Sequence, residues 1–527
     1  MSPDAQKQVR FFLIATPIFY VNDVPHIGHA YTEVAADALS RWMRNSGIDT
    51  WFLTGTDEHG QKIMRTALAN GVAPKEWADR LVEQAWKPLL STLNLANDDF
   101  IRTTEERHES AVQKFLSLLH DKGFIYQGEY EGFYCVGCEE YKTPADLAEG
   151  TDEFEGQKVC QIHGRPIEVL KEENYFFKMS EFQDQLLELY RTRPDFIQPA
   201  SVKNEIVAFV NRGLEDLSIS RSNIDWGIEL PFDSDHVTYV WFEALLNYIT
   251  ATGWGANDDE FSRRWPAVQL VGKDIARFHA VIWPAMLMAA GLEPPRNVFA
   301  HGWLLVGGEK MSKSKLTGIA PSDITDVFGS DAFRYYFLRA ITFGSDGSFS
   351  WEDLSARYEA ELANGLGNLA SRVIAMIHRY RGGVVPDPAA GSAEAETALQ
   401  SVISDAVAKA NTAMHAFAPH EALSQIWRIV EDTNGYLTEQ EPWALAKDEA
   451  QADRLDAVLY HSADALRVLA VVLHPFMPHS MSALWGALGQ TGEPGDQPLL
   501  EEAVTGGLNP GTGVLELPPL FPRIEQD

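Results

Sequence analysis

Short apolar runs that alternate with amphipathic stretches constrain the fold of this chain more than any other feature. Residues 11–15 (FFLIA) and 50–54 (TWFLT) have the composition of buried strands, and apolar residues at helical spacing lie between them. This order predicts a βαβ unit built on a parallel sheet. Two further apolar runs, at 268–271 and 298–300, predict that the same sheet resumes far downstream.

The first polar motif, His26-Ile27-Gly28-His29, falls where the first strand gives way to the helix. We expect both histidines in or just before the first helical turn, where unpaired backbone N–H groups and the helix dipole favour an anion. Imidazole N–H groups placed there can stabilise charge that develops on phosphate oxygens. Gly28 has no side chain, so a flat base or ribose can approach the backbone. The alternative is that each histidine is only a cap or a core residue.

The second motif runs from Lys310 to Ser314 (KMSKS) and follows an apolar strand and a hairpin predicted at 303–308. Lysines are compact charges on long stems, suited to a mobile clamp on phosphates. The chain carries a formal net charge of −32, so a tight basic cluster is unusual in it. We therefore predict that the two motifs, remote in sequence, converge on one polyphosphate.

The three cysteines lie close together in the sequence and predict a metal site. With one histidine they form two pairs, Cys135 with Cys138 and Cys160 with His163. Four such ligands suit tetrahedral Zn²⁺, and because the protein supplies all four we expect one structural zinc ion per chain. An odd number of cysteines gives no even disulfide framework. The alternative is reduced core cysteines beside an incidental histidine.

These patterns predict an α/β fold in which a parallel-sheet domain is split by an insertion and followed by a helical bundle. The expected ranges are 1–125 (first half of the sheet domain), 126–225 (insertion with the zinc knuckle), 226–315 (second half), 316–355 (linker from the lysine loop), 356–500 (bundle) and 501–527 (tail along the surface). No apolar run approaches the length of a membrane span, and the N-terminus lacks a signal-peptide pattern. We therefore expect a cytoplasmic protein that binds no membrane.

The two motifs, in this order, resemble the signatures of the class I aminoacyl-tRNA synthetases. Further segments resemble the methionine-specific group of that family and extend the resemblance over about residues 11–480: Tyr20, 54–60 (TGTDEHG), 239–244 (YVWFEA), 272–275 (GKDI), 278–279 (FH) and 441–443 (EPW). The resemblance implies a Rossmann-type catalytic domain split by a zinc-knuckle insertion, then an anticodon-binding helical bundle. It also implies ATP-dependent attachment of methionine to tRNA(Met) through a methionyl-adenylate, with release of pyrophosphate and AMP.

The same resemblance assigns the residues that meet ATP. It implies that the phosphates are stabilised by His26, His29, Lys310 and Lys313. It implies that ATP, accompanied by Mg²⁺, is bound by Gly28, Gly272, Asp274, Met311 and Ser312, with Asp274 accepting from ribose hydroxyls. The sequence departs from the family after Ser314, where residues 315–318 (KLTG) stand in place of the usual Gly-Asn or Gly-Thr. This departure puts the far end of the loop in doubt.

For methionine, the resemblance implies that Asp57 binds the amino group, a charge-assisted contact. It implies an apolar, aromatic pocket around the thioether, formed by Ile18, Tyr20, Trp241, Ala244, Leu245, Tyr248, Ile275 and His279. Thioether sulfur gains from contacts with ring edges, and we expect Tyr20 or His279 to donate weakly to it. The alternatives are a strand-end turn at Asp57 and ordinary core packing of the aromatic residues.

Recognition of the anticodon is implied for Asn368, Arg372 and Trp443. An exposed tryptophan can stack on an unpaired base, and asparagine and arginine can bond to its edge. The net charge argues against binding nucleic acid through bulk electrostatics, so we expect a local basic track formed by Arg372, His378, Arg379 and Arg381. The expected partners are initiator and elongator tRNA(Met). Because no further domain follows the bundle, we expect a monomer.

Three other functions are compatible with the sequence. The chain resembles synthetases for other apolar amino acids in its two motifs, and exchange assays with each amino acid separate these. A non-catalytic tRNA-binding protein on the same fold is disfavoured because both motifs are intact. A small nucleotidyltransferase shares the first motif but needs neither the insertion nor the bundle.

Overall fold

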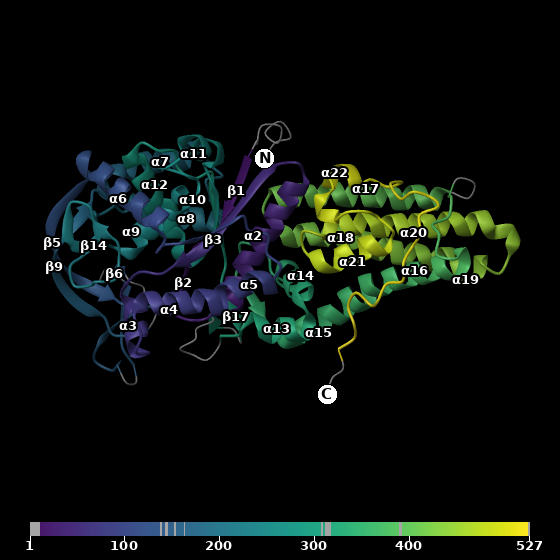
Figure 1. Ribbon diagram of the computed structural model, residues 1–527, viewed down its shortest axis with the longest axis horizontal. Helices are drawn as coiled ribbons and strands as arrows, with labels where there is room; N and C mark the ends of the chain where they lie inside the picture. The colour runs from purple at the N-terminus through teal and green to yellow at the C-terminus, as the bar shows by residue number, and fades with distance from the viewer. Residues whose placement is uncertain are drawn as a thin grey trace.

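The computed structural model describes residues 11–524 apart from 138–139, 143–145, 152–153, 163, 307–308, 311–317 and 389–392, with the backbone alone at 130–131, 140–141, 170–172 and 309–310. The molecule is elongated, with the part that contains the sheets at one end and a helical bundle at the other (Figure 1). Within the described ranges, no helix is long and apolar enough to cross a lipid bilayer.

A seven-stranded parallel sheet lies at the centre of the first part. The strand order is β10-β16-β15-β1-β3-β2, with β4 also paired to β3, and every pairing is parallel. All four strands expected from apolar runs are confirmed. The bounds are β1 (Phe11–Ala15), β2 (Phe19–Tyr20), β3 (Asp49–Asp57), β4 (Asp99–Arg102), β10 (Ile197–Gln198), β15 (Val268–Gly272) and β16 (Asn297–His301).

The strand order reverses at β1. The strands that follow it first in the chain, β2, β3 and β4, lie on one side, whereas β15 and β16 lie on the other. In open parallel sheets, ligands bind beyond the carboxyl ends of the strands at such a switch point. The carboxyl ends of β1, β3, β15 and β16 therefore mark the candidate site.

Helix α2 (Ile27–Asn45) connects β2 to β3, and the helical spacing predicted for it is confirmed. Its apolar residues are almost fully buried, Val34, Leu39 and Trp42 among them. The other helical segments of this part are α3 (Gln61–Ala69), α4 (Pro74–Leu81), the π-helical η1 (Val82–Trp86), α5 (Lys87–Thr92), α6 (Glu106–Asp121), α9 (Val240–Ala244), α10 (Asn247–Ala251), α11 (Asp258–Arg264), the 3₁₀ turn η5 (Lys273–Ile275), η6 (Phe278–Ile282) and α12 (Trp283–Ala290).

The range expected as an insertion differs from the rest by its antiparallel strands. Its main ladder joins β5 (Ile125–Cys135) to β9 (Glu168–Phe177). Around it lie β6 (Glu140–Lys142), β7 (Leu147–Glu149), β8 (Lys158–Cys160), η4 (Met179–Phe182), α7 (Gln183–Thr192), α8 (Ala200–Asn211), β11 (Leu217–Ser218), β12 (Ser220–Arg221), β13 (Glu229–Leu230) and β14 (Asp233–Thr238). The range 126–225 also contains β10, which pairs with β16, so it contributes a strand to the central sheet.

The range 316–355, expected as a linker, contains regular structure. It holds α13 (Pro321–Phe328), α14 (Ser330–Ala340), β19 (Gly347–Phe349) and the start of α15 (Trp351–Arg357). Strand β19 pairs in parallel with β17 (Leu304–Val306), so this segment closes a small sheet beside the lysine motif. Helix α14 packs on α2 and on α18 of the bundle, which makes it a structural bridge between the two parts of the molecule.

The predicted helical bundle is confirmed. It consists of η8 (Tyr358–Gly367), α16 (Asn368–Arg381), α17 (Glu394–His415), α18 (Pro419–Gln440), α19 (Pro442–Leu445), η9 (Glu449–Gln451), α20 (Ala452–Leu473), α21 (Pro478–Ala487), η10 (Pro494–Asp496) and α22 (Leu499–Glu502). The final stretch is irregular and lies along the bundle with Val514 and Phe521 buried against it.

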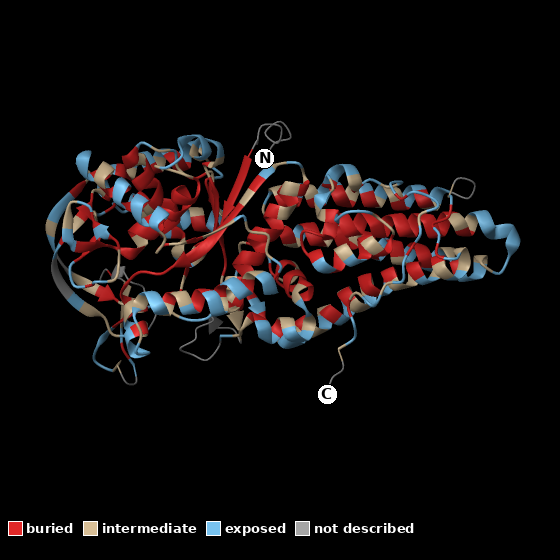
Figure 2. Ribbon diagram, viewed as in Figure 1, coloured by how far each residue is buried: buried red, intermediate tan, exposed pale blue. Residues whose placement is uncertain are grey.

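One hydrophobic core runs from α2 into the bundle, as the continuous buried residues in Figure 2 show. At the junction, the fully buried guanidinium of Arg334 donates to Asp37 Oδ2 of α2 at 2.6 Å. It also donates to the carbonyl oxygens of Leu93 (3.0 Å), Pro475 (2.8 Å) and Phe476 (2.9 Å). A single side chain therefore connects helix α2, the end of α5 and the bundle.

Candidate active site

The His26–His29 turn begins helix α2. His26 is the N-cap, and its Nδ1 accepts a hydrogen bond from the backbone N–H of Gly28 at 3.1 Å. His29 Nδ1 accepts in turn from the backbone N–H of His26 at 3.1 Å, and the two rings stack with centroids 3.8 Å apart. A ring nitrogen that accepts from an N–H has no proton of its own, so each imidazole bears its hydrogen on Nε2. The turn thus provides two N–H donors at a helix N-terminus, as the motif predicts.

The chain leaves the lysine motif beside this turn. The backbone N–H of Ile27 donates to the carbonyl oxygen of Ile319 at 3.0 Å, shortly after residues 311–317. Before the motif, β17 pairs antiparallel with β18 (Glu309–Lys310), so the predicted hairpin is confirmed and Lys310 lies on its second strand. Met311, Ser312 and Lys313 lie outside the described residues. The segment that follows the second motif therefore contacts the N-terminus of α2, and the convergence of the two motifs stays a prediction.

Gly272 and His301 end β15 and β16 and lie opposite each other in the register. A Cβ atom on Gly272 would stand 2.6 Å from Asp274 Oδ1, so any side chain there would collide with this exposed carboxylate. His301 Nε2 lies 2.8 Å from Thr32 Oγ1 of α2, and its Nδ1 lies 2.8 Å from the Gly302 carbonyl oxygen. Burial lowers the pKa of His301, which keeps the ring neutral. This histidine joins the sheet to α2 and was not among the predicted site residues.

Asp57 ends β3, and only 2% of it is exposed. Strand β2 pairs with β3 so that Tyr20 lies directly opposite Asp57. The ammonium of Lys62 stands 5.8 Å from the centroid of the Tyr20 ring. The two residues that the sequence assigned to the amino group and the pocket are thus neighbours at the carboxyl edge of the sheet.

An aromatic wall continues from Tyr20. Its ring meets Trp241 edge-on with centroids 6.0 Å apart, and Trp241 stacks on Phe278 at 4.2 Å. Most of the predicted pocket residues belong to one hydrophobic cluster, namely Ile18, Tyr20, Trp241, Leu245, Tyr248 and Ile275, while Ala244 is buried next to Leu245 in the chain. The sequence therefore identified residues that the fold brings together.

The expectation that His279 donates to a thioether is not supported by its hydrogen bonds. His279 Nδ1 lies 3.0 Å from the carbonyl oxygen of Ile275, which can only accept, so Nδ1 bears the hydrogen. Nε2 then accepts from the hydroxyl of Tyr248 at 2.8 Å. Burial lowers the pKa of His279 to about 4, so a second proton is absent at neutral pH. Both nitrogens have a hydrogen-bond partner, so the ring has a fixed orientation.

A buried acid-base cluster behind the pocket was not predicted. Glu243 Oε1 lies 3.0 Å from His59 Nδ1 and its Oε2 lies 2.8 Å from His108 Nε2. Burial alone would raise the pKa of Glu243, but the two imidazoles outweigh it and hold that pKa below its usual value. The sequence contained His59 and Glu243 within the family-like strings, yet nothing in it pointed to His108. The cluster fixes the helix that carries Trp241 to the loop after Asp57.

The three residues assigned to the anticodon lie on two helices of the bundle, α16 and α19. Asn368 begins α16 and is exposed, and Arg372 follows one turn later. The guanidinium of Arg372 stands 5.8 Å from the centroid of the Trp443 ring. Trp443 is 38% exposed, so its ring is accessible at the surface of the bundle. Of the expected basic track, Arg381 forms an ion pair with Asp456.

The predicted zinc ligands are only partly described. Cys135 ends β5 and Cys160 ends β8, and both are buried. Cys138 and His163 lie outside the described residues. Among the residues that are described, no group of three or more potential ligands forms a metal site. The two buried thiols have the chemistry of zinc ligands.

The chain is similar to known proteins over its whole length. Residues 12–374 match the family model "tRNA synthetases class I (M)", and residues 385–527 match "Anticodon binding domain of methionyl tRNA ligase". The methionine–tRNA ligase of Streptomyces coelicolor is 55% identical, with 99% of this chain and 98% of the relative covered. That of Bacillus subtilis is 43% identical, with 98% of this chain and 78% of the relative covered.

A solved structure shares both the architecture and the sequence. Mycobacterium tuberculosis methionyl-tRNA synthetase, in complex with methionyl-adenylate, superposes with a TM-score of 0.93 and 40% identity, covering 98% of this chain and 100% of that one. Sheet topology, bundle and motifs thus agree with one family along the entire chain. The chain belongs to the class I methionine–tRNA ligases.

Proposed function

We propose that this chain attaches methionine to tRNA(Met) through a methionyl-adenylate, with ATP as the second substrate. One observation supports the assignment: Tyr20, Asp57 and Gly272, which are matched to methionine and adenosine, end β2, β3 and β15 of one parallel sheet. Residues 1–125 and 226–315 form the catalytic domain, joined by β10 from the insertion 126–225. The segment 316–355 leads to the anticodon-binding range 356–500, and 501–527 forms the tail.

In the first step, the methionine carboxylate attacks the α-phosphorus of ATP and pyrophosphate leaves. The protein contributes position and charge rather than a covalent intermediate. The Nε2–H groups of His26 and His29 donate to phosphate oxygens, and Lys310 and Lys313 neutralise charge on the leaving pyrophosphate. Mg²⁺ accompanies ATP. The adenosine lies along the backbone at Gly28 and Gly272, its ribose hydroxyls donate to Asp274, and Met311 and Ser312 contact the nucleotide.

Methionine recognition follows from the carboxylate and the aromatic wall. Asp57 accepts from the substrate ammonium in a buried setting, where a charge-assisted bond is strong. The thioether lies among the edges and faces of the surrounding rings, which favour polarisable sulfur. The hydrogen bond from Tyr248 holds the His279 ring in place, so the pocket has a defined shape before substrate arrives.

The direct test is methionine-dependent ATP–pyrophosphate exchange. We expect exchange with methionine and much weaker exchange with leucine, isoleucine, valine and cysteine. Lys313→Ala should lower kcat by roughly 100-fold or more, since one preorganised donor to developing charge contributes that much in comparable sites. Exchange that depends on another amino acid, or that is unchanged in Lys313→Ala, contradicts the proposal.

The bundle selects the tRNA. Asn368, Arg372 and Trp443 meet the anticodon, with Trp443 as the stacking surface and Asn368 and Arg372 as partners for base edges. Since initiator and elongator tRNA(Met) share the anticodon, both are substrates. We infer that the enzyme acts as a monomer in the cytoplasm, where tRNA charging supplies translation. Sedimentation analysis tests whether the enzyme is a monomer.

The insertion holds one structural Zn²⁺. Cys135, Cys138, Cys160 and His163 would supply its four ligands, and the burial of both described thiols fits this role. Such an ion stabilises the strands that carry its ligands. Elemental analysis should give one zinc per chain, and Cys135→Ser should reduce that content. A full-length protein that is folded and free of zinc contradicts the assignment.

A further inference from the structure

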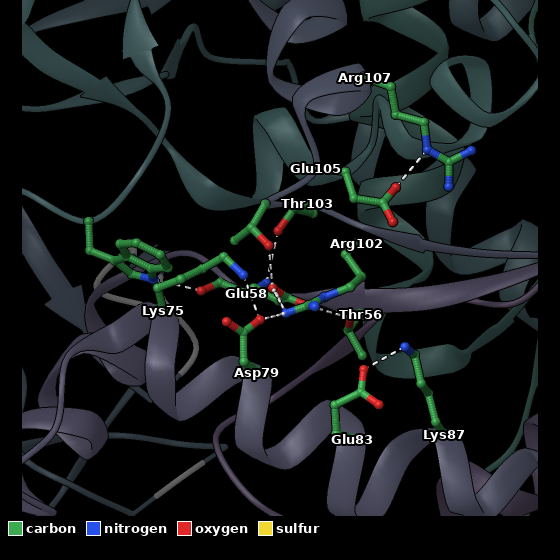
Figure 3. A network of polar contacts seen from close by, with 12 residues as sticks. Thr56, Glu58, Lys75, Asp79, Glu83, Lys87, Arg102, Thr103, Glu105 and Arg107 are labelled. Carbon is green, nitrogen blue, oxygen red and sulfur yellow. Dashed lines mark hydrogen bonds and ion pairs between the residues drawn. The ribbon is translucent and has the colours of Figure 1, made fainter.

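Glu58, the residue after Asp57, is fully buried and its carboxylate is held from several sides (Figure 3). Arg102 of β4 binds it in a bidentate manner, with Nε 2.6 Å from Oε1 and Nη2 2.9 Å from Oε2. The hydroxyls of Thr56 and Thr104 donate to the same two oxygens at 2.7 and 2.5 Å. Bidentate guanidinium–carboxylate pairs fix orientation as well as adding attraction. The side chain after Asp57 therefore has one defined position.

The backbone at Glu58 is fixed as well. Its N–H donates to Thr103 Oγ1 at 2.9 Å, and its carbonyl oxygen accepts from Trp226 Nε1 at 2.6 Å. The residue after it, His59, is held by Glu243. Asp57 is thus followed by two residues whose side chains are both anchored. The direction in which the Asp57 carboxylate leaves the strand depends on this anchoring.

Arg102 has a second partner on the other side. Its Nη2 donates to Asp79 Oδ1 of α4 at 2.5 Å (Figure 3). Helix α4 continues into η1, which carries Trp86. Trp86 stacks on Phe19 with centroids 5.3 Å apart and lies 5.1 Å from the His29 ring. One guanidinium thus connects the strand end that bears Asp57 to the helix that packs behind the histidine turn.

We propose that Arg102 is a positioning residue for adenylate formation: by binding Glu58 and Asp79 together, it sets Asp57 for the methionine ammonium and keeps that site in register with the His26–His29 turn. The inference rests on the proposed role of Asp57. Arg102 itself lies behind the strand end and acts through its partners. We therefore expect Arg102 to affect binding of the substrate ammonium, which meets Asp57, more than binding of the rest of methionine.

Two methionine analogues separate this role from a general structural one. Methioninol keeps the ammonium and the thioether but lacks the carboxylate, whereas 4-(methylsulfanyl)butanoate keeps the carboxylate and the thioether but lacks the ammonium. In Arg102→Lys, which loses the bidentate geometry, the dissociation constant of methioninol from calorimetry should rise about tenfold, because small misplacement of a binding group is costly. That of the butanoate should stay within about twofold. Glu58→Gln should give the same split.

Arg107→Lys is the matched control. Arg107 also makes a bidentate contact, with Asp99, and an ion pair with Glu105, but it is exposed and lies apart from the Glu58–Arg102 pair (Figure 3). Neither analogue should change its affinity in this variant. Equal weakening of both analogues in Arg102→Lys and Glu58→Gln, or no weakening of either, overturns the inference.

Asp57→Asn separates the inference from the function on which it rests. Loss of methioninol affinity in Asp57→Asn, without loss in Arg102→Lys, overturns the role of Arg102 alone. Unchanged methioninol affinity in Asp57→Asn instead overturns the assignment of Asp57 as the ammonium site. Loss of methioninol affinity in both variants, with the affinity for the butanoate unchanged in Arg102→Lys, supports the roles of Asp57 and Arg102 together.

Discussion

At the scale of single residues, hydrogen bonds decide which atom of a side chain can act. The motif predicted that two histidines stand at a helix start, but only the backbone donors to both Nδ1 atoms show that Nε2 carries the hydrogen. The same reasoning removed His279 as a donor to sulfur, because the Ile275 carbonyl and the Tyr248 hydroxyl occupy its ring. Such assignments depend on the positions of individual donor and acceptor atoms, which the spacing of a sequence motif does not specify.

Tyr248→Phe tests the fixed ring. Loss of the hydroxyl leaves His279 Nε2 buried without its donor, at a cost of about 1–2 kcal/mol. We expect the methionine KM in pyrophosphate exchange to rise about fivefold to thirtyfold, with a smaller change in kcat. Tyr358→Phe, which removes a hydroxyl bonded to the Pro522 carbonyl oxygen in the bundle, serves as the control. An unchanged KM in Tyr248→Phe would show that the ring needs no such support.

At the scale of elements, sequence periodicity found the long pieces and missed the short ones. The strands at 11–15 and 268–271, helix α2 and the bundle were predicted because apolar spacing persists over whole elements. Strand β10 has two residues, too few for any periodic pattern, so its place in the central sheet depends on β16. Helices α13 and α14 lie in the range predicted as a linker. Helix α14 packs on both α2 and α18, and these contacts are not visible in the sequence around it.

Glu396 tests how helix α17 is anchored. It accepts from the Ala393 N–H at 2.6 Å, pairs with Arg454 of α20 at 2.8 Å and accepts from the Tyr436 hydroxyl. Burial opposes ionisation, but these partners outweigh it and lower the pKa of Glu396 to about 2. The stabilisation is therefore present above pH 4.5, the usual value, and is lost as the pH falls toward 2.

We expect Glu396→Gln to lower the free energy of unfolding by about 2 kcal/mol at neutral pH. Its unfolding midpoint in urea should also depend less on pH between about 2 and 4.5 than that of the wild type. The exposed Glu394 stands in the same first turn, so Glu394→Gln is the control and should leave both quantities nearly unchanged. A pH dependence identical to wild type in Glu396→Gln would contradict the account.

At the scale of the whole molecule, the two parts share one core. Asp37 and Arg334 are both fully buried, and each lies among groups from different parts of the fold. Trp42 of α2 adds a direct hydrogen bond to Asn411 of α17, with Nε1 3.0 Å from Oδ1. The sequence predicted the two parts but not this junction, since no pattern within either one reveals the partner across the boundary.

Arg334→Met should destabilise the protein by about 3–5 kcal/mol, because it breaks the buried ion pair with Asp37 and removes the guanidinium donor to three carbonyl oxygens. Chemical denaturation followed by tryptophan fluorescence measures the loss. Arg339→Met is the control: its side chain is more exposed and lies 3.7 Å from Glu361. A similar decrease in the free energy of unfolding in both variants would show that Arg334 contributes no more to stability than an ordinary, partly exposed arginine.

Trp443→Ala should reduce methionine transfer to tRNA(Met) by 10-fold or more, since a stacked base is worth about 1–3 kcal/mol. ATP–pyrophosphate exchange should be unchanged, because Trp443 belongs to α19, which lies toward the end of the bundle remote from the sheets (Figure 1). Trp443→Phe should retain most of the charging activity through its aromatic ring. Equal loss of exchange and charging in Trp443→Ala would remove the residue from the anticodon site.

The shared core of α2 and the bundle means that the anticodon surface and the adenylate site are separated by a preset distance. A tRNA lengthened or shortened by one base pair in its acceptor stem would bring its terminal ribose to the wrong depth, even with the correct anticodon. The enzyme would therefore select its tRNA by length as well as by anticodon sequence, because the buried junction fixes the separation of the two binding sites.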